Sequence, residues 1–183
     1  MHAPPDSLQV GNAAAARSFF NQSMMLKPSV LAARNLATFE TTREGASAFY
    51  HRAWSLWEQM DARTDPVTFQ LGADLAGEMC GWMQGNSRWS ELTAFLATLG
   101  RDARTQPYLQ KDKVLHATAA LAVQESDHVK AISILRGHCF PTYGSQRTAL
   151  IQLWYQANLL QVQYELIDRT HEPRPSLLGP SFS

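Results

Sequence analysis

The stretch HATAALAVQESDHVKAISIL, residues 116–135, gives the clearest indication of the fold. It contains two apolar runs, residues 116–123 and 128–135, separated by the polar break QESD. The first run is rich in alanine, which favours helices and allows helix backbones to approach closely. In the second run Leu135 follows Ala131 by four residues and Ile132 by three, so the three share one helical face. We therefore predict two helices joined by a tight turn, an αα-hairpin whose apolar faces require neighbouring helices for burial.

The composition of the whole chain is that of a folded protein. Of its 183 residues 45% are hydrophobic and 17% are charged, and sixteen basic residues balance sixteen acidic ones. Because there is no net charge, we expect neither a nucleic-acid partner nor an anionic membrane surface. No apolar run reaches the length of a transmembrane helix. Cys80 and Cys139 are too few for a disulfide framework, which favours a reduced, cytoplasmic setting.

Helical periodicity and helix-stop signals divide the chain into successive helices, and no stretch alternates like a strand. We expect a cap at Asn12, a cap at Ser29, a turn at Gly45, a break at Asp65-Pro66 and a left-handed C-cap at Gly100. The expected helices cover residues 12–26, 30–42, 46–60, 67–83, 89–99, 109–123, 128–137 and 145–168. The sequence thus predicts an all-α domain over residues 12–168, with a disordered arm at 1–11 and a disordered tail at 169–183.

Apolar positions in the expected helices recur every 39 residues. Three sets keep this interval: Ala53, Leu92 and Ala131; Leu56, Phe95 and Ile134; and Trp57, Leu96 and Leu135. The first helices of the expected pairs align at Leu36, Leu75, Val114 and Leu153, and a proline stands shortly before each pair. A helix pair repeated at this interval is expected to stack into a solenoid, because each pair buries its apolar face on the next.

Four residues near the N-terminus suggest a known family. A small residue, an aromatic residue, a second small residue and a proline stand at Ala16, Phe20, Ser23 and Pro28. With these offsets the chain resembles tetratricopeptide-repeat proteins over residues 12–167. The resemblance implies a right-handed α-solenoid of antiparallel helix pairs. The repeats here are degenerate and, at 39 residues, longer than the family's unit of about 34, so a HEAT-like array stays open.

The segment around Ala16 has the residue pattern of the second half of a repeat. We therefore expect that the chain is a truncated or isoform piece of a longer array, with an apolar stripe at Phe19, Met24 and Leu26 available for self-association. The run 139–144, CFPTYG, also bears a faint resemblance to the helical C-terminal region of large proteins that carry a sugar-mutarotase-like β-domain. That resemblance implies a second function, as the accessory region of a larger carbohydrate-active protein.

The sequence contains no recognisable catalytic or metal-binding motif. None of the six histidines has HxxxH or HExxH spacing, no serine lies in GxSxG, and no glycine-rich phosphate loop occurs. Cys80 lies in an apolar helix, which favours the role of a small buried hydrophobe. We therefore expect no catalysis, no cofactor and no metal ion.

The expected function is a protein–protein interaction scaffold. In tetratricopeptide-like arrays the first helices line the concave face, so the resemblance implies that a peptide or partner domain binds there. The candidate partner-binding residues on this face are Asn35, Lys113, His116, Trp154 and Asn158. Their amide, cationic and aromatic groups suit an extended or helical peptide. Ordinary surface residues on a structural spacer are the alternative.

Overall fold

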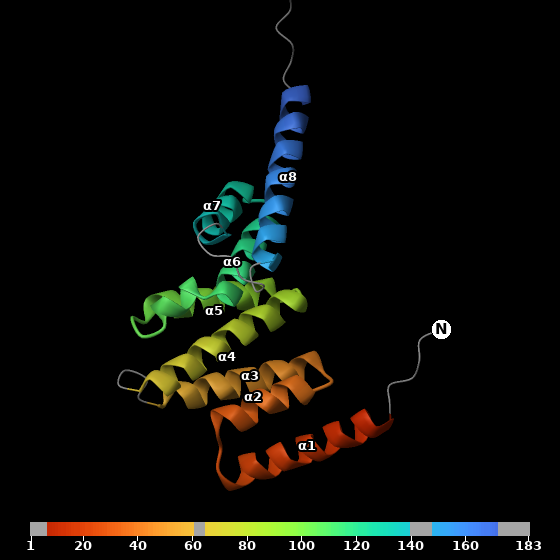
Figure 1. Ribbon diagram of the computed structural model, residues 1–183, viewed down its shortest axis with the longest axis vertical. Helices are drawn as coiled ribbons and strands as arrows, with labels where there is room; N and C mark the ends of the chain where they lie inside the picture. Colours follow the sequence, from red (N-terminus) through yellow and green to blue (C-terminus); the bar gives the residue numbers. More distant parts are fainter. Residues whose placement is uncertain (1–6, 61–64, 140–147, 172–183) are drawn as a thin grey trace, which may run out of the picture. The chain divides into compact units, whose positions relative to one another are not determined.

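The computed structural model describes residues 7–60, 65–139 and 148–171, and this part of the chain is helical without a strand. Figure 1 shows the helices in chain order. They are α1 (Ser7–Leu26), α2 (Val30–Phe39), α3 (Arg43–Glu58), α4 (Pro66–Gly85), α5 (Trp89–Arg101), the 3-10 helix η1 (Gln106–Gln110), α6 (Asp112–Gln124), α7 (His128–Cys139) and α8 (Thr148–His171). The all-α prediction is confirmed. No helix in these ranges is long and apolar enough to span a bilayer.

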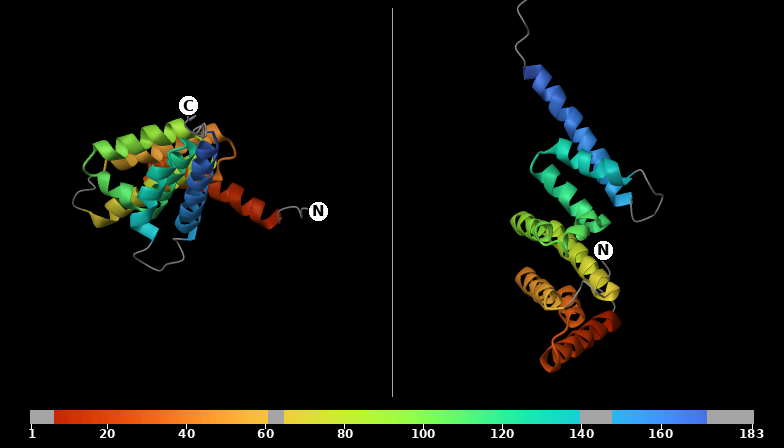
Figure 2. Two further views of the ribbon diagram at one scale, coloured as in Figure 1. Left: turned by 90° about the horizontal axis from the view of Figure 1, so that it is seen from above. Right: turned by 90° about the vertical axis from the view of Figure 1, so that its left-hand side faces the viewer.

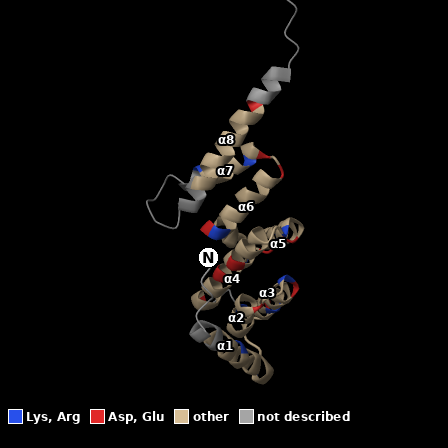
Figure 3. Ribbon diagram, turned by 90° about the vertical axis from the view of Figure 1, so that its right-hand side faces the viewer, with Lys and Arg blue, Asp and Glu red and all other residues tan. Residues whose placement is uncertain are grey.

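The chain divides into two compact units. Unit 1 comprises residues 1–117 and unit 2 comprises residues 118–183, so the boundary falls within α6. In unit 1 each of the helices α1 to α5 packs on its neighbour in the sequence, and Figure 2 shows these contacts from two further sides. Figure 3 shows the charged positions as short, separate segments of both signs, in agreement with the balanced composition.

The 39-residue periodicity is visible in the pattern of burial. The first set, Ala53 of α3, Leu92 of α5 and Ala131 of α7, is completely buried. The aligned positions of the first helices are buried as well: Leu36, Leu75, Val114 and Leu153. The apolar faces that the sequence assigned to both series of helices are therefore confirmed at these positions.

The centre of unit 1 is a tryptophan ring packed on a helix backbone. Trp57 of α3 lies against Gly72 of α4, where a Cβ atom would come 2.3 Å from Trp57 Cε2. The indole Nε1–H donates to the backbone oxygen of Thr68 at 2.9 Å, which fixes the ring in place. The ring of Tyr108 on η1 lies tilted against Trp57 with ring centroids 5.7 Å apart, and its hydroxyl donates to the backbone oxygen of Phe69. A glycine is required at position 72 because no side chain fits beneath the indole.

Some of the predicted helix ends are confirmed and others are wrong. Ser29 caps α2 by accepting from the Ala32 amide, and Asp65 caps α4 by accepting from two amides. Asn12, however, lies inside α1, which begins at Ser7. Gly45 does not lie in a loop between helices as predicted. Thr42 caps α3, and Gly45 is the third residue of that helix. Gly100 lies inside α5, which continues to Arg101 without a left-handed glycine.

Unit 2 is built on close contacts between alanines. Three alanines from three helices, Ala122 of α6, Ala131 of α7 and Ala157 of α8, form one buried cluster. The second cluster comprises Ala119, Ala120, Leu135 and Leu153. The predicted tight turn between α6 and α7 is confirmed: Ser126 adopts a φ of 61°, and the Asp127 amide donates to the Ala122 oxygen at 2.8 Å. The expected C-terminal tail lies mostly outside the described residues.

Candidate functional site

The five predicted partner-binding residues fall in both units. Asn35 lies on α2, and Lys113 and His116 lie on the part of α6 that belongs to unit 1. Trp154 and Asn158 lie on α8 in unit 2. In unit 1 the three predicted residues belong to, or lie next to, the side-chain contacts that connect α2 to α4 and α4 to α6.

An ion pair joins α2 to α4. The guanidinium of Arg34 binds the carboxylate of Glu78 through two N–H groups, with Nε 2.7 Å from Oε2. Both side chains are about a quarter exposed. The hydrogen bond to Glu78 raises the pKa of Arg34 above its ordinary value. Beside this pair, burial raises the pKa of Tyr50, whose ring lies 5.6 Å from that of Trp82.

A hydrogen bond and a close packing contact join α4 to α6. His116 Nδ1 lies 3.0 Å from the amide oxygen of Gln84, so its N–H donates. Burial lowers the pKa of His116 below its ordinary value, which favours the neutral ring. One turn earlier, the aliphatic part of Lys113 lies on Gly77, where a Cβ atom would come 3.1 Å from Lys113 Cβ. Lys113 itself is exposed.

We call the residues of these contacts, together with Asn35 next to Arg34 on α2, the first-helix strip: Arg34, Asn35, Glu78, Gln84, Lys113 and His116. Sequence reasoning found Asn35, Lys113 and His116 but missed the other three. Arg34 and Glu78 come from expected helices, whereas Gln84 lies just beyond the expected helix 67–83 and falls within α4 because that helix continues to Gly85. The side chains of all three meet their partners only across helices. Arg34 and Glu78 are 44 positions apart, an interval that the 39-residue repeat does not suggest.

In unit 2 the predicted residues contact one another along α8. The amide nitrogen of Asn158 donates to the backbone oxygen of Trp154 at 2.7 Å. Trp154 packs partly buried against the cluster that contains Leu135 and Leu153, with its ring 5.2 Å from that of Tyr155. One amide hydrogen of Asn158 is therefore engaged by its own helix.

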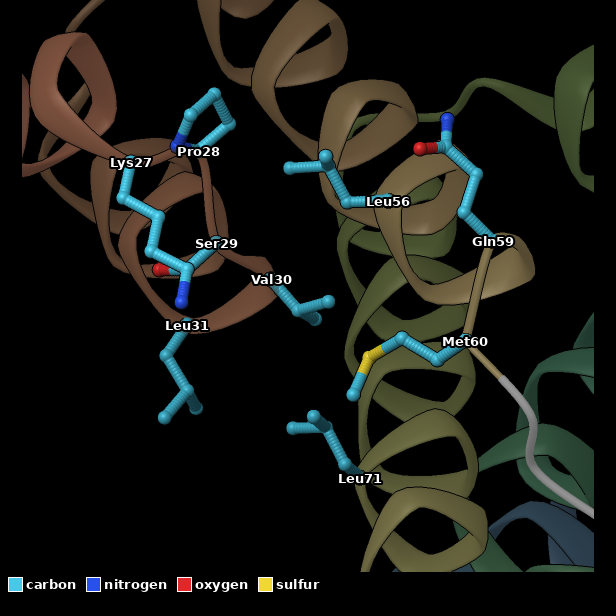
Figure 4. Close-up of a pocket in the computed structure, with 9 residues that line it drawn as sticks. All are labelled: Lys27, Pro28, Ser29, Val30, Leu31, Leu56, Gln59, Met60 and Leu71. Carbon is cyan, nitrogen blue, oxygen red and sulfur yellow. The ribbon is translucent and has the colours of Figure 1, made fainter.

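Unit 1 also has an apolar pocket that sequence reasoning did not predict. It has a volume of about 430 Å³ and lies where the segment between α1 and α2 meets the end of α3 and the first half of α4. Figure 4 shows Val30 on one side of it, with Met60 and Leu71 pointing toward it from the other. The lining residues are Lys27, Pro28, Ser29, Val30, Leu31, Leu56, Gln59, Met60 and Leu71. We call it the Leu71 pocket.

The described residues offer little for covalent or metal chemistry. Within the described ranges no three His, Cys, Asp or Glu side chains gather as a metal site would require. Cys80 is completely buried, as predicted, and burial raises the pKa of its thiol to about 12. The thiol is therefore protonated at neutral pH, and the thiolate is the reactive form.

Comparisons with protein-family models, with curated proteins and with solved structures found no match for the chain. The resemblance to tetratricopeptide repeats and the fainter one to a mutarotase-linked region stay predictions.

Proposed function

We propose that the chain is a helical-repeat interaction module that binds an extended segment of a partner protein along the first-helix strip. The supporting observation is the pair of side-chain links between α2 and α4 and between α4 and α6. Arg34–Glu78 and Gln84–His116 hold successive first helices together. The second helices are linked as well, since the rings of Trp54 on α3 and Phe95 on α5 lie 4.9 Å apart.

This proposal assigns separate roles to the residues of the strip. Arg34 and Glu78 neutralise each other, and Gln84 and His116 are joined by a hydrogen bond, so these four fix the spacing of the helices. The exposed ammonium of Lys113 and the partly exposed amide of Asn35 are then available to a ligand. An amide and a cation suit the backbone and the carboxylates of an extended peptide, which is how many helical-repeat surfaces hold their partners.

The test is a selection of random displayed peptides on the full chain, followed by fluorescence anisotropy with the selected peptides. Lys113→Glu should weaken binding by about tenfold or more, because it replaces an attraction by a repulsion. Asn35→Ala should weaken it less. The matched control is Lys130→Glu, the same change at an exposed lysine of α7 in unit 2.

Two outcomes would overturn the proposal. One is a selection that yields no peptide above background. The other is a set of peptides whose affinity falls equally in Lys113→Glu and Lys130→Glu, since binding would then depend on overall charge. Circular dichroism of each variant establishes that the fold is intact.

A further inference from the structure

The Leu71 pocket has an apolar wall and one cation at its edge. Six of its lining residues are apolar and come from α2, α3, α4 and the segments just before α2 and just after α3: Pro28, Val30, Leu31, Leu56, Met60 and Leu71. Val30 is buried, so it forms part of the floor. A volume of about 430 Å³ is within the range of protein pockets that accept apolar groups.

Exposed apolar side chains surround the opening of this pocket. Leu31 is 53% exposed and Met60 is 39% exposed. Val67, one helical turn before Leu71 on α4, is 75% exposed. Clustered exposed apolar residues of this kind mark surfaces for another polypeptide, and methionine adapts to different side-chain shapes. The pocket and its surroundings therefore suit the apolar face of an amphipathic peptide.

The polar groups at the pocket determine which charge the ligand should carry. The oxygen of the Ser29 hydroxyl accepts from the Ala32 amide, so its place is fixed at the start of α2. Lys27 is the only charged residue among those that line the pocket, and it is exposed. Among the described residues no ion pair involves its ammonium group. The N-terminus of α2 at the same place adds a partial positive charge. The complementary ligand is therefore acidic next to its apolar anchor.

We infer that the Leu71 pocket binds an aliphatic side chain, of the size of leucine, from an amphipathic partner helix whose neighbouring carboxylate pairs with Lys27. Helices of this type bind apolar grooves through side chains spaced i, i+3 and i+4. The pocket shares no residue with the first-helix strip, so this inference does not depend on the proposed function. The two surfaces can be tested separately on the same chain.

The probe is a fluorescein-labelled amphipathic peptide with leucines at i, i+3 and i+4 and flanking glutamates, titrated into the full chain. Leu31→Asp should weaken its binding by about tenfold or more, since it puts a carboxylate at the mouth of the pocket. The variant should fold, because position 31 is exposed in the first turn of α2, where an acidic residue is favourable. Val129→Asp is the matched control, being the same change at an exposed first-turn position of α7.

A charge reversal tests the role of Lys27. Lys27→Glu should weaken binding of the glutamate peptide about tenfold, and a peptide with lysines in place of the glutamates should recover affinity for that variant. In a chain labelled with ¹³C-methyl methionine, the Met60 signal, assigned with Met60→Leu, should shift when the glutamate peptide is added. These results together would place the peptide in the pocket.

Three results would overturn the inference. The first is equal affinity of the wild-type chain for the lysine and glutamate peptides. The second is binding that is lost in Lys113→Glu but kept in Leu31→Asp, which would place the peptide on the first-helix strip. The third is an absence of peptide binding while dodecanoate shifts the Met60 signal, which would identify a site for small amphiphiles instead.

Discussion

The centres of the two units of this chain are filled by different kinds of side chain. In unit 1 large rings fill the space between helices, with Trp57 resting on the bare backbone of Gly72 and in tilted ring contact with Tyr108. In unit 2 the helices meet through alanines, of which Ala122, Ala131 and Ala157 share one cluster. Unit 1 buries alanines too, but its centre is a ring above a glycine, whereas the buried clusters of unit 2 take alanines from every one of its helices. The difference implies that enlarging a small residue changes the free energy of unfolding by amounts that depend on what the residue packs against.

The largest expected effect is that of Gly72→Ala. The new Cβ would lie 2.3 Å from an indole that a hydrogen bond to Thr68 holds in place, so the free energy of unfolding should fall by about 3 kcal/mol. The control is Gly81→Ala on the same helix, where nothing lies within 4 Å of the added Cβ. That change should raise the free energy of unfolding by up to about 1 kcal/mol, because alanine favours the helix.

Urea denaturation followed by circular dichroism measures both changes. If the two α4 variants shifted the free energy of unfolding by the same amount, the contact between Trp57 and Gly72 would not determine the packing of unit 1.

A smaller effect is expected from Ala131→Leu in unit 2. Leucine at this completely buried position must displace Ala122 and Ala157, which should lower the free energy of unfolding by about 2 kcal/mol. Ser133→Leu, at an exposed position two residues further along α7, should change it by no more than about 0.5 kcal/mol. Equal stability of the two variants in urea would show that the alanines of unit 2 are not needed for close helix contact.

The smallest effect is expected from the pH dependence of His116. Burial lowers its pKa in the folded chain, so between its ordinary value of 6.5 and the lower folded value the unfolded chain binds more protons. Stability from this residue is fully present above pH 6.5 and is lost as the pH falls through the folded pKa. In His116→Gln the urea midpoint should therefore decrease less between pH 7 and pH 5 than in the wild type. Identical pH profiles would mean that the imidazole is not desolvated between α4 and α6.

The positions of the helices and their buried faces could be read from the sequence. Ala53, Leu92 and Ala131 were assigned to a common buried face because apolar residues recurred at a fixed interval, and all three are buried. Local chemistry also located Ser29 as a cap. The predictions of a turn at Gly45 and of a C-cap at Gly100 were wrong, because both glycines lie inside helices. A glycine that permits a turn can also lie in a helix when other residues form the helix end. At Gly45 a Cβ would come 2.5 Å from Glu40 Cγ, so close approach is the reason for glycine there.

The candidate site was predictable only in part. Lys113 and His116 were selected because they belong to an expected first helix. Their partners, Gly77 and Gln84, could not be found, because a separation of 32 in sequence between Gln84 and His116 does not indicate which turns of α4 and α6 face each other. The Leu71 pocket could not be found for the same reason, as its walls come from three helices, the connection before α2 and the residues after α3.

The sequence by itself determined that the described part of the chain is helical, where most of its helices lie and that repeated apolar positions such as Ala53, Leu92 and Ala131 are buried. These properties follow from the spacing of apolar residues along a helix of 3.6 residues per turn, which is a local matter. Only the tertiary structure decided that Trp57 rests on Gly72, that Arg34 pairs with Glu78, and that a pocket opens beside Lys27. Contacts of this kind depend on how far one helix slides and turns against another, and that is set by the packing of all their side chains together.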